Sequence, residues 1–310
     1  MADTLTKPET FPGKAGYYAR VWVRASRPFT LTGAAVPVLV GTALALRDSI
    51  ASVGPFILIL IASLLVQIAA NLVDEYSDHA RPEGQQKHLA PYKVIALGLL
   101  SHRAVKQGAM TCLAIATGIG IYLVVISGWP LLVLCLASAA AAYLYSGGPK
   151  PLGAYGIGQP LVFIFFGPVM VMGTYYVFGK AFTLDAFWLS LPVGFNITNI
   201  LVANDLRDRE EDAAAHKMTP VAMFGERFGH GEWLIFLLAA YIVVINRALN
   251  GYGPWLLLTL AALPWAVQTF RLILRESDRG EKARALRLTA RLNGYFGLLL
   301  AAGVVLGHII

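Results

Sequence analysis

The sequence predicts an all-α membrane protein, a nine-helix transmembrane bundle with cytoplasmic capping loops. Hydrophobic residues make up 57% of the 310 positions and charged residues only 14%, and the mean hydropathy is +0.62. A water-soluble surface carries more charge than this. Long apolar runs recur along the chain. Because lipid leaves exposed strand edges without hydrogen-bond partners, we expect these runs to be helices.

Nine stretches have the length of about 17–25 mostly apolar residues that a bilayer requires. The first contains Pro37, which a helix inside a bundle tolerates because its neighbours satisfy the freed backbone groups. In chain order the predicted spans are about 30–46, 54–76, 104–126, 130–146, 157–178, 184–204, 232–249, 254–272 and 292–309.

The distribution of positive charge predicts the orientation of these spans. With the N-terminus inside, 22 of the 25 Lys and Arg residues fall on the cytoplasmic side, and only Arg47, Lys180 and Arg247 fall outside. Residues 1–28 are polar and lack the apolar core of a signal peptide, so they are expected to be a cytoplasmic segment. Residues 29–310 then form one transmembrane domain in the inner (plasma) membrane. The formal charge of +7 lies in short patches between spans, which favours membrane lipids over nucleic acid as a partner.

Two cytoplasmic connections are long, about 77–103 and 205–231. Long loops in a compact bundle are often functional. Each is expected to contain a short helix at the membrane face, at Pro91–Leu100 and Pro220–Phe228.

An acidic motif closes each of the second and sixth spans. In the first acidic motif Asn71, Asp74, Glu75 and Asp78 are spaced i, i+3, i+4 and i+7, so they share one helix face. The second acidic motif, Asn204 to Asp212, places Asn204, Asp208 and Asp212 on one face in the same way. A solvated helix end explains one such cluster. Two clusters on the same side indicate a cation site, because ionised carboxylates near membrane depth are costly.

Mg²⁺ is the metal that suits these motifs. It prefers hard oxygen ligands, takes one or two carboxylates from a segment, and completes its shell with water and substrate phosphate oxygens. Zinc is not expected, because the six His are scattered and Cys112 and Cys135 lie in apolar runs.

A third element, Tyr143 to Lys150, follows the fourth span. Its Gly-Gly-Pro sequence ends a helix and matches no nucleotide-binding fingerprint. Tyr145, Ser146 and Lys150 carry a phenol, a hydroxyl and an ammonium, all of which donate hydrogen bonds to phosphate oxygens.

Together these elements resemble the UbiA superfamily of intramembrane aromatic prenyltransferases, over nearly the whole chain from about Val23. Four further segments are similar to the branch that prenylates 1,4-dihydroxy-2-naphthoate on the way to menaquinone: Arg24–Pro28, Tyr145–Gly153, Phe163–Gly167 and Gly173–Tyr176. The resemblance implies nine helices around a lipid-open cavity, in which Mg²⁺ holds a polyprenyl diphosphate beside an aromatic acceptor.

The resemblance also implies roles for particular residues. Metal ligands would be Asn71, Asp74, Glu75, Asp78, Asp208 and Asp212. Diphosphate contacts would be Asn71, Tyr145, Ser146, Lys150, Asn204, Arg207 and Lys217. Asp74, Asp78, Asp208 and Tyr145 would be catalytic, with Asp74 or Asp78 assisting deprotonation of the acceptor. Aromatic candidates for the cavity wall are Tyr143, Phe166, Tyr175 and Tyr176, and cationic candidates for an acceptor carboxylate are Arg24, Arg27 and Lys93.

Two departures from the branch accompany the resemblance. Asp74-Glu75-Tyr76 stands where the branch reads Asn-Asp-Tyr, and His216-Lys217-Met218-Thr219 stands where it reads Gly-Lys-Arg-Thr. We interpret them as altered site geometry or acceptor choice. The alternatives are another aromatic or lipid acceptor, a catalytically silent paralogue, and a secondary transporter, although transporter sites lie near the membrane midplane rather than at helix ends on one face.

Overall fold

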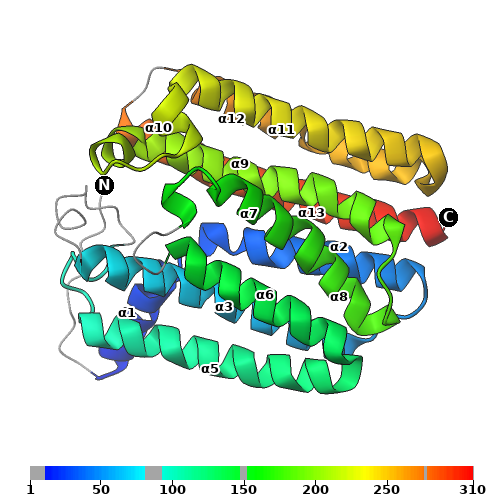
Figure 1. Ribbon diagram of the computed structural model, residues 1–310, viewed down its shortest axis with the longest axis horizontal. Coiled ribbons are helices and arrows are strands. Elements are labelled where there is room, and N and C mark those ends of the chain that lie inside the picture. Colours follow the sequence, from blue (N-terminus) through cyan, green and yellow to red (C-terminus); the bar gives the residue numbers. More distant parts are fainter. Residues whose placement is uncertain (1–10, 81–92, 147–151, 276–277, 310) are drawn as a thin grey trace. The chain divides into compact units, whose positions relative to one another are not determined.

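The computed structural model describes residues 11–80, 93–146, 152–275 and 278–309, without the side chains of residues 11–14, 78, 80 and 146. Every regular element in these ranges is helical, as predicted (Figure 1). The elements are α1 (Phe11–Ala25), η1 (Pro28–Thr30), α2 (Thr32–Arg47), α3 (Val53–Ala80), α5 (His102–Ser127), α6 (Trp129–Ser146), η2 (Leu152–Ala154), α7 (Gly158–Ile164), η3 (Phe165–Val169), α8 (Met170–Gly179), α9 (Leu184–Ala214), α10 (Pro220–Phe224), α11 (Glu226–Arg247), η4 (Ala248–Tyr252), η5 (Pro254–Ala262), α12 (Leu263–Ile273) and α13 (Arg279–Ile309).

Helices lie at each of the predicted spans. Eight helices in the described ranges are long and apolar enough to cross a membrane, and the remaining predicted span is a shorter apolar helix, Trp129–Tyr145. Pro37 lies inside α2, so the first span is a continuous helix. An all-helical architecture with helices long and apolar enough to cross a membrane is thereby confirmed for the described residues, whereas the count of nine spans and the side on which the loops lie stay predictions.

Two helices continue well beyond the predicted spans. α9 runs on to Ala214 instead of ending near residue 204, and α13 begins at Arg279 instead of near residue 292. Hydropathy marks the depth of the membrane and not the end of a helix, and Arg, Glu and Lys are good helix formers outside lipid. The second acidic motif therefore lies on a helix rather than in the predicted loop 205–231.

The two predicted short helices have different outcomes. The second one is found in part: α10 covers Pro220–Phe224, Gly225 with a φ of 87° ends it, and the residues after Gly225 belong to α11. In the first one, the described residues 93–100 form turns and no helix, and residues 91 and 92 lie outside the described ranges.

The chain divides into two compact units, which are described separately. Unit 1 comprises Met1–Leu31 and Ile61–Gly118. Its core contains Tyr17, Val21 and Ala25 of α1, spaced four residues apart, packed with Leu72 and Val105. The segment 1–28, expected only to be polar and basic, thus includes a helix with one buried face.

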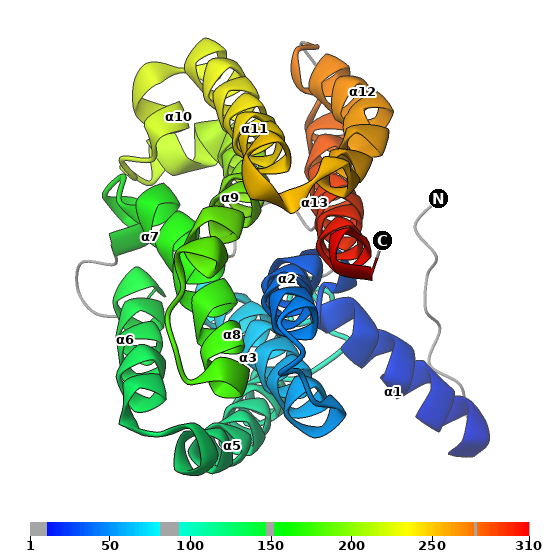
Figure 2. The same cartoon turned by 90° about the vertical axis from the view of Figure 1, so that its right-hand side faces the viewer.

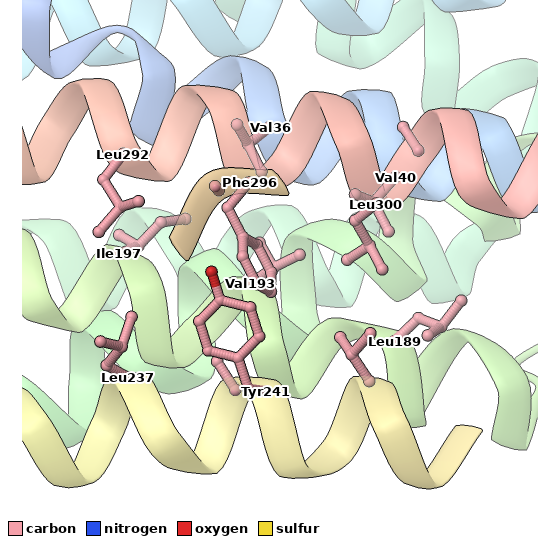
Figure 3. Packing of buried hydrophobic residues seen from close by; sticks show 14 of the residues in the cluster. Val36, Val40, Leu189, Val193, Ile197, Leu237, Tyr241, Leu292, Phe296 and Leu300 are labelled. Carbon is pink, nitrogen blue, oxygen red and sulfur yellow. The ribbon is translucent and has the colours of Figure 1, made fainter. Parts of the chain in front are cut away.

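Unit 2 comprises Thr32–Leu60 and Ile119–Ile310. In it α9 packs along α11 and α13, and α13 packs along α2; Figure 2 views these four helices almost along their axes. Figure 3 shows their buried side chains meeting, among them Val36, Val193, Tyr241 and Phe296. Apolar packing therefore fixes α9, which carries the second acidic motif.

A polar cluster joins helix ends at the start of α9. Asp185 accepts hydrogen bonds from Arg47 at 2.9 Å and from Arg247 at 3.3 Å. Tyr252 is buried beside both guanidinium groups, whose Cζ atoms lie 4.6 and 5.3 Å from its ring centre. Residues 185 and 208 are separated by about 35 Å at 1.5 Å per helical residue, so this cluster is remote from the second acidic motif.

Candidate functional site

In unit 1, Asn71 of the first acidic motif holds a turn between α1 and η1. It is buried, and its Nδ2 donates to the Ser26 carbonyl at 2.8 Å and to Thr30 Oγ1 at 2.9 Å. Arg27, between those two partners, has a left-handed backbone with φ 49°. Such a conformation is costly for a residue with a side chain and persists only when its surroundings impose it. The Asn71 amide provides that constraint, and its predicted role toward metal or diphosphate stays a prediction.

The constrained turn places Arg27 on the carboxylates of the same motif. Its Nη2 lies 2.7 Å from Asp74 Oδ2 and 3.9 Å from Glu75 Oε2. Glu75 is buried, accepts a hydrogen bond from the Ile95 amide at 3.0 Å, and has Lys93 Nζ 3.8 Å from Oε2. Two of the three cations expected to bind an acceptor carboxylate, Arg27 and Lys93, therefore meet at Glu75.

In unit 2, Asp208 of the second acidic motif is bound by two arginines. Arg207 donates to both of its oxygens, with Nε 2.8 Å from Oδ1. The Arg207 Nη2 also reaches Asn204 Oδ1 at 2.8 Å. Arg279, at the start of α13, donates to Oδ1 of Asp208 at 3.1 Å and also to Glu211. Hydrogen bonds thus join Asn204, Arg207 and Asp208, and Arg279, which is distant in the sequence and was not predicted, joins them.

Asp212 is paired with Lys217 by the way α9 ends. His216 takes a left-handed conformation with φ 54°, the Lys217 amide donates to the Asp212 carbonyl at 2.8 Å, and the His216 amide donates to the Ala213 carbonyl at 3.1 Å. This is the helix ending in which glycine is usual at the left-handed position. The reversal of the chain brings Lys217 Nζ to 2.8 Å from Asp212 Oδ1.

Tyr145, near the end of α6, is packed against η2. A Cβ on Gly153 would lie 3.1 Å from the Tyr145 ring, so the ring approaches the η2 backbone closely. η2 is also tied to the segment that follows the second acidic motif, because the Met218 amide donates to the Ala154 carbonyl at 2.7 Å. Packing and this backbone bond therefore link α6, η2 and Lys217–Met218 within unit 2.

A polar trio that includes Asp205 of the second acidic motif was not predicted. Gln159 of α7 donates from Nε2 to Asp205 at 3.3 Å and to Glu232 of α11 at 3.1 Å. Gln159 and Asp205 are both buried. Asp205 is part of the second acidic motif in the sequence. Gln159 and Glu232 lie in no motif, and only the packing of α7 and α11 against α9 brings them to Asp205.

Several predicted residues cannot be placed at the site. The side chains of Asp78 and Ser146, and the whole of Lys150, lie outside the described residues. Tyr175, a candidate for the cavity wall, lies away from the second acidic motif: its hydroxyl donates to Asp48 at 2.6 Å, next to the Arg47–Asp185 cluster at the far end of α9. Tyr176 donates to the Ser127 carbonyl at 3.3 Å and stacks on Phe182. The Tyr175-Tyr176 pair in the sequence therefore does not show near which end of α9 the two side chains lie.

The donor set in unit 2 fits Mg²⁺. Asp208 and Asp212 are hard oxygen ligands one helical turn apart, and each already holds a cationic nitrogen. No group of three His, Cys, Asp or Glu side chains in the described part of the chain forms a closed metal cage. Mg²⁺ needs no such cage when water and phosphate oxygens complete its shell.

Comparison with known proteins agrees with the motifs. The model of the UbiA prenyltransferase family matches residues 34–306. A 1,4-dihydroxy-2-naphthoate octaprenyltransferase of Bacillus subtilis is 28% identical over 97% of this chain and 96% of its own. The enzyme of the same description from Mycobacterium tuberculosis is 32% identical over 93% of this chain and 98% of its own.

Solved structures support the fold. A UbiA homologue from Aeropyrum pernix superposes with a TM-score of 0.64 at 16% identity, covering 89% of this chain and 97% of that one. A UbiA homologue from Archaeoglobus fulgidus, bound to GPP and Mg²⁺, superposes with a TM-score of 0.62 at 14% identity, covering 90% of this chain and 99% of that one. At these identities the likeness concerns the fold alone.

Proposed function

The chain belongs to the UbiA prenyltransferase family, and from that premise we propose that it transfers a polyprenyl group from a polyprenyl diphosphate to 1,4-dihydroxy-2-naphthoate in a Mg²⁺-dependent reaction. One observation carries the proposal: Asp208 and Asp212 lie one turn apart on α9 and are paired with positively charged side chains. The carboxylates can bind Mg²⁺, and Arg207, Arg279 and Lys217 can bind the negatively charged diphosphate. The relatives described as 1,4-dihydroxy-2-naphthoate octaprenyltransferases, which align over nearly the whole chain, support the choice of acceptor.

The reaction breaks the bond between the first prenyl carbon and its oxygen, and the electron pair leaves with the diphosphate. Bound Mg²⁺ supplies Lewis-acid neutralisation of that leaving group. Arg207, Lys217 and the Tyr145 hydroxyl are proposed to donate to the diphosphate oxygens as their negative charge grows. The proposed metal ligands are Asn71, Asp74, Glu75, Asp78, Asp208 and Asp212.

The acceptor ring then forms the new carbon–carbon bond at the carbon that bears the carboxylate. The electron pair of the broken ring–carboxylate bond restores aromaticity, and CO₂ leaves. Asp74 or Asp78 is proposed to take a hydroxyl proton of the acceptor as the ring attacks and to return it to the ring oxygen after CO₂ leaves. The Asp74 side chain is about half exposed. Arg27 and Lys93, which meet at Glu75, are the proposed partners of the acceptor carboxylate.

The test is a product assay with the purified full chain, a polyprenyl diphosphate and Mg²⁺. It is offered either 1,4-dihydroxy-2-naphthoate or 4-hydroxybenzoate, and prenylated product, diphosphate and CO₂ are measured. We expect product and CO₂ from the naphthoate alone. Preferred prenylation of 4-hydroxybenzoate would contradict the acceptor, and release of no diphosphate from either would contradict the reaction.

A further inference from the structure

The Asp208 carboxylate is occupied by guanidinium groups on both oxygens. Oδ1 accepts from Arg207 Nε at 2.8 Å and from Arg279 Nη2 at 3.1 Å, and Oδ2 accepts from Arg207 Nη2. A Mg²⁺ ligand must offer a lone pair at about 2.0–2.1 Å from the metal. Guanidinium and metal therefore compete for the same carboxylate.

Arg279 is the partner that can leave. It also donates to both oxygens of Glu211, at 2.9 Å to Oε2, so it keeps two hydrogen bonds after losing the one to Asp208. Its side chain is 35% exposed, whereas that of Arg207 is 10% exposed. Arg207 is also the sequence neighbour of Asp208 on one rigid helix, while Arg279 comes from α13.

The charges of this cluster explain what would make Arg279 leave. Arg207, Arg279, Asp208 and Glu211 sum to zero formal charge. A divalent cation alone would face two guanidinium groups at short range, and a diphosphate alone would face two carboxylates, so each is opposed. When both are present, the carboxylate faces metal and the guanidinium faces phosphate oxygens, for which its planar fork is suited.

We propose that Arg279 is an exchangeable counter-ion of the metal site. It holds Asp208 in the metal-free protein and moves to the diphosphate when metal and diphosphate bind. Each of the two therefore binds more tightly when the other is present, and thermodynamic linkage makes the factor the same in both directions. This inference rests on the proposed function, since it assigns the diphosphate as the partner that receives Arg279.

The test uses the full-length protein in detergent with Mn²⁺ in place of Mg²⁺. The electron paramagnetic resonance signal of free Mn²⁺ measures metal binding without diphosphate. Equilibrium dialysis of ³²P-labelled inorganic diphosphate at a fixed Mn²⁺ concentration then measures anion binding. The variants are Arg279→Gln, Arg279→Lys as the version that keeps the charge, and Lys282→Gln as the matched control. Lys282 lies one turn along α13 and pairs with Glu226 instead of the motif.

The expected result is a pair of changes with opposite sign. In Arg279→Gln, Mn²⁺ alone binds about fivefold more tightly and diphosphate about fivefold more weakly, since a partly exposed ion pair of about 1 kcal/mol corresponds to that factor. Arg279→Lys keeps the charge but loses the planar fork, so it tightens Mn²⁺ binding by about twofold, whereas Lys282→Gln leaves Mn²⁺ binding unchanged. If Arg279→Gln leaves Mn²⁺ binding unchanged or weakens it, the proposal is wrong.

This outcome is independent of the product assay. Product from the naphthoate together with no opposite changes in Arg279→Gln would refute the exchange and leave the proposed function intact. Opposite changes without any prenylated product would refute the proposed function and leave the exchange intact. A variant that unfolds is recognised by loss of the monodisperse elution peak, and the Arg279→Lys comparison then decides, because a lysine with one contact should tighten Mn²⁺ binding and not weaken it.

Discussion

Arg279 Nη2 lies 3.1 Å from Asp208 Oδ1, although the two residues are 71 positions apart in the sequence. The contact joins the beginning of α13 to the second acidic motif near the end of α9. Both ends extend beyond the apolar parts of their helices, so hydropathy does not indicate that they meet. The carboxylate expected to bind metal is consequently held by a cation from the last helix of the bundle.

Replacing Asp208 with Asn should abolish prenyl transfer while leaving the protein folded. The amide keeps the shape of the side chain but loses the charge that attracts Mg²⁺. The control is Glu210→Gln, which removes an equal charge from an exposed position two residues away on α9. Product formation over a Mg²⁺ titration checks this prediction. Near-normal turnover of Asp208→Asn at limiting Mg²⁺ would show that Asp208 is not a ligand.

Gln159→Leu should destabilise unit 2. The leucine removes the donor shared by Asp205 and Glu232 and leaves two carboxylates without it, at a cost of about 1–3 kcal/mol. Gln107→Leu is the control, because Gln107 is exposed on α5. Thermal unfolding in detergent compares the two variants. Equal melting temperatures would mean that the trio contributes nothing to stability.

His216→Gly should be tolerated and should stabilise the end of α9. His216 is left-handed, a conformation that costs a residue with a side chain about 1 kcal/mol and costs glycine almost nothing. The pairing of Lys217 with Asp212 should survive, because the backbone bonds that place it do not involve the histidine ring. His216→Val, with its branched Cβ, should lower the melting temperature. The opposite order of the two variants would contradict the assigned backbone conformation.

Asp185→Asn should lower the stability of the protein without changing its prenyl transfer activity. The substitution removes the charge that Arg47 and Arg247 share, about 35 Å along α9 from Asp208. We expect a lower melting temperature and an unchanged Mg²⁺ dependence of product formation. Lys180→Gln, an exposed cation nearby in sequence, is the control. A changed Mg²⁺ dependence would mean that the two ends of α9 are coupled.

The predicted orientation is tested by labelling single cysteines from either side of sealed membranes. Cys112 and Cys135 are first replaced with Ser, and a cysteine is then placed at Ser101 or Asn250, both of which are exposed. The positive-inside rule predicts the inner side for residue 101 and the outer side for residue 250. Labelling of both from one side would disprove the nine-span topology.

The sequence by itself determined the all-helical class, the positions of the apolar helices and the two acidic motifs. These features are local, because helix length, apolar content and the spacing of Asn204, Asp208 and Asp212 are written along one segment. The family resemblance came from the same short motifs. The ends of α9 and α13 were misplaced because apolar content falls where the membrane ends, while the helix continues.

Only the tertiary structure decided which charges meet. Arg279 reaches Asp208, Gln159 joins Asp205 to Glu232, and Arg27 with Lys93 meets at Glu75. Each of these contacts depends on how side chains of separate helices and turns pack, and a charged residue in sequence does not specify its partner across space. The same packing placed Tyr175 at the opposite end of α9 from the second acidic motif. The sequence does not show this position, because neighbouring helices can cover a buried aromatic side chain at either end of the molecule.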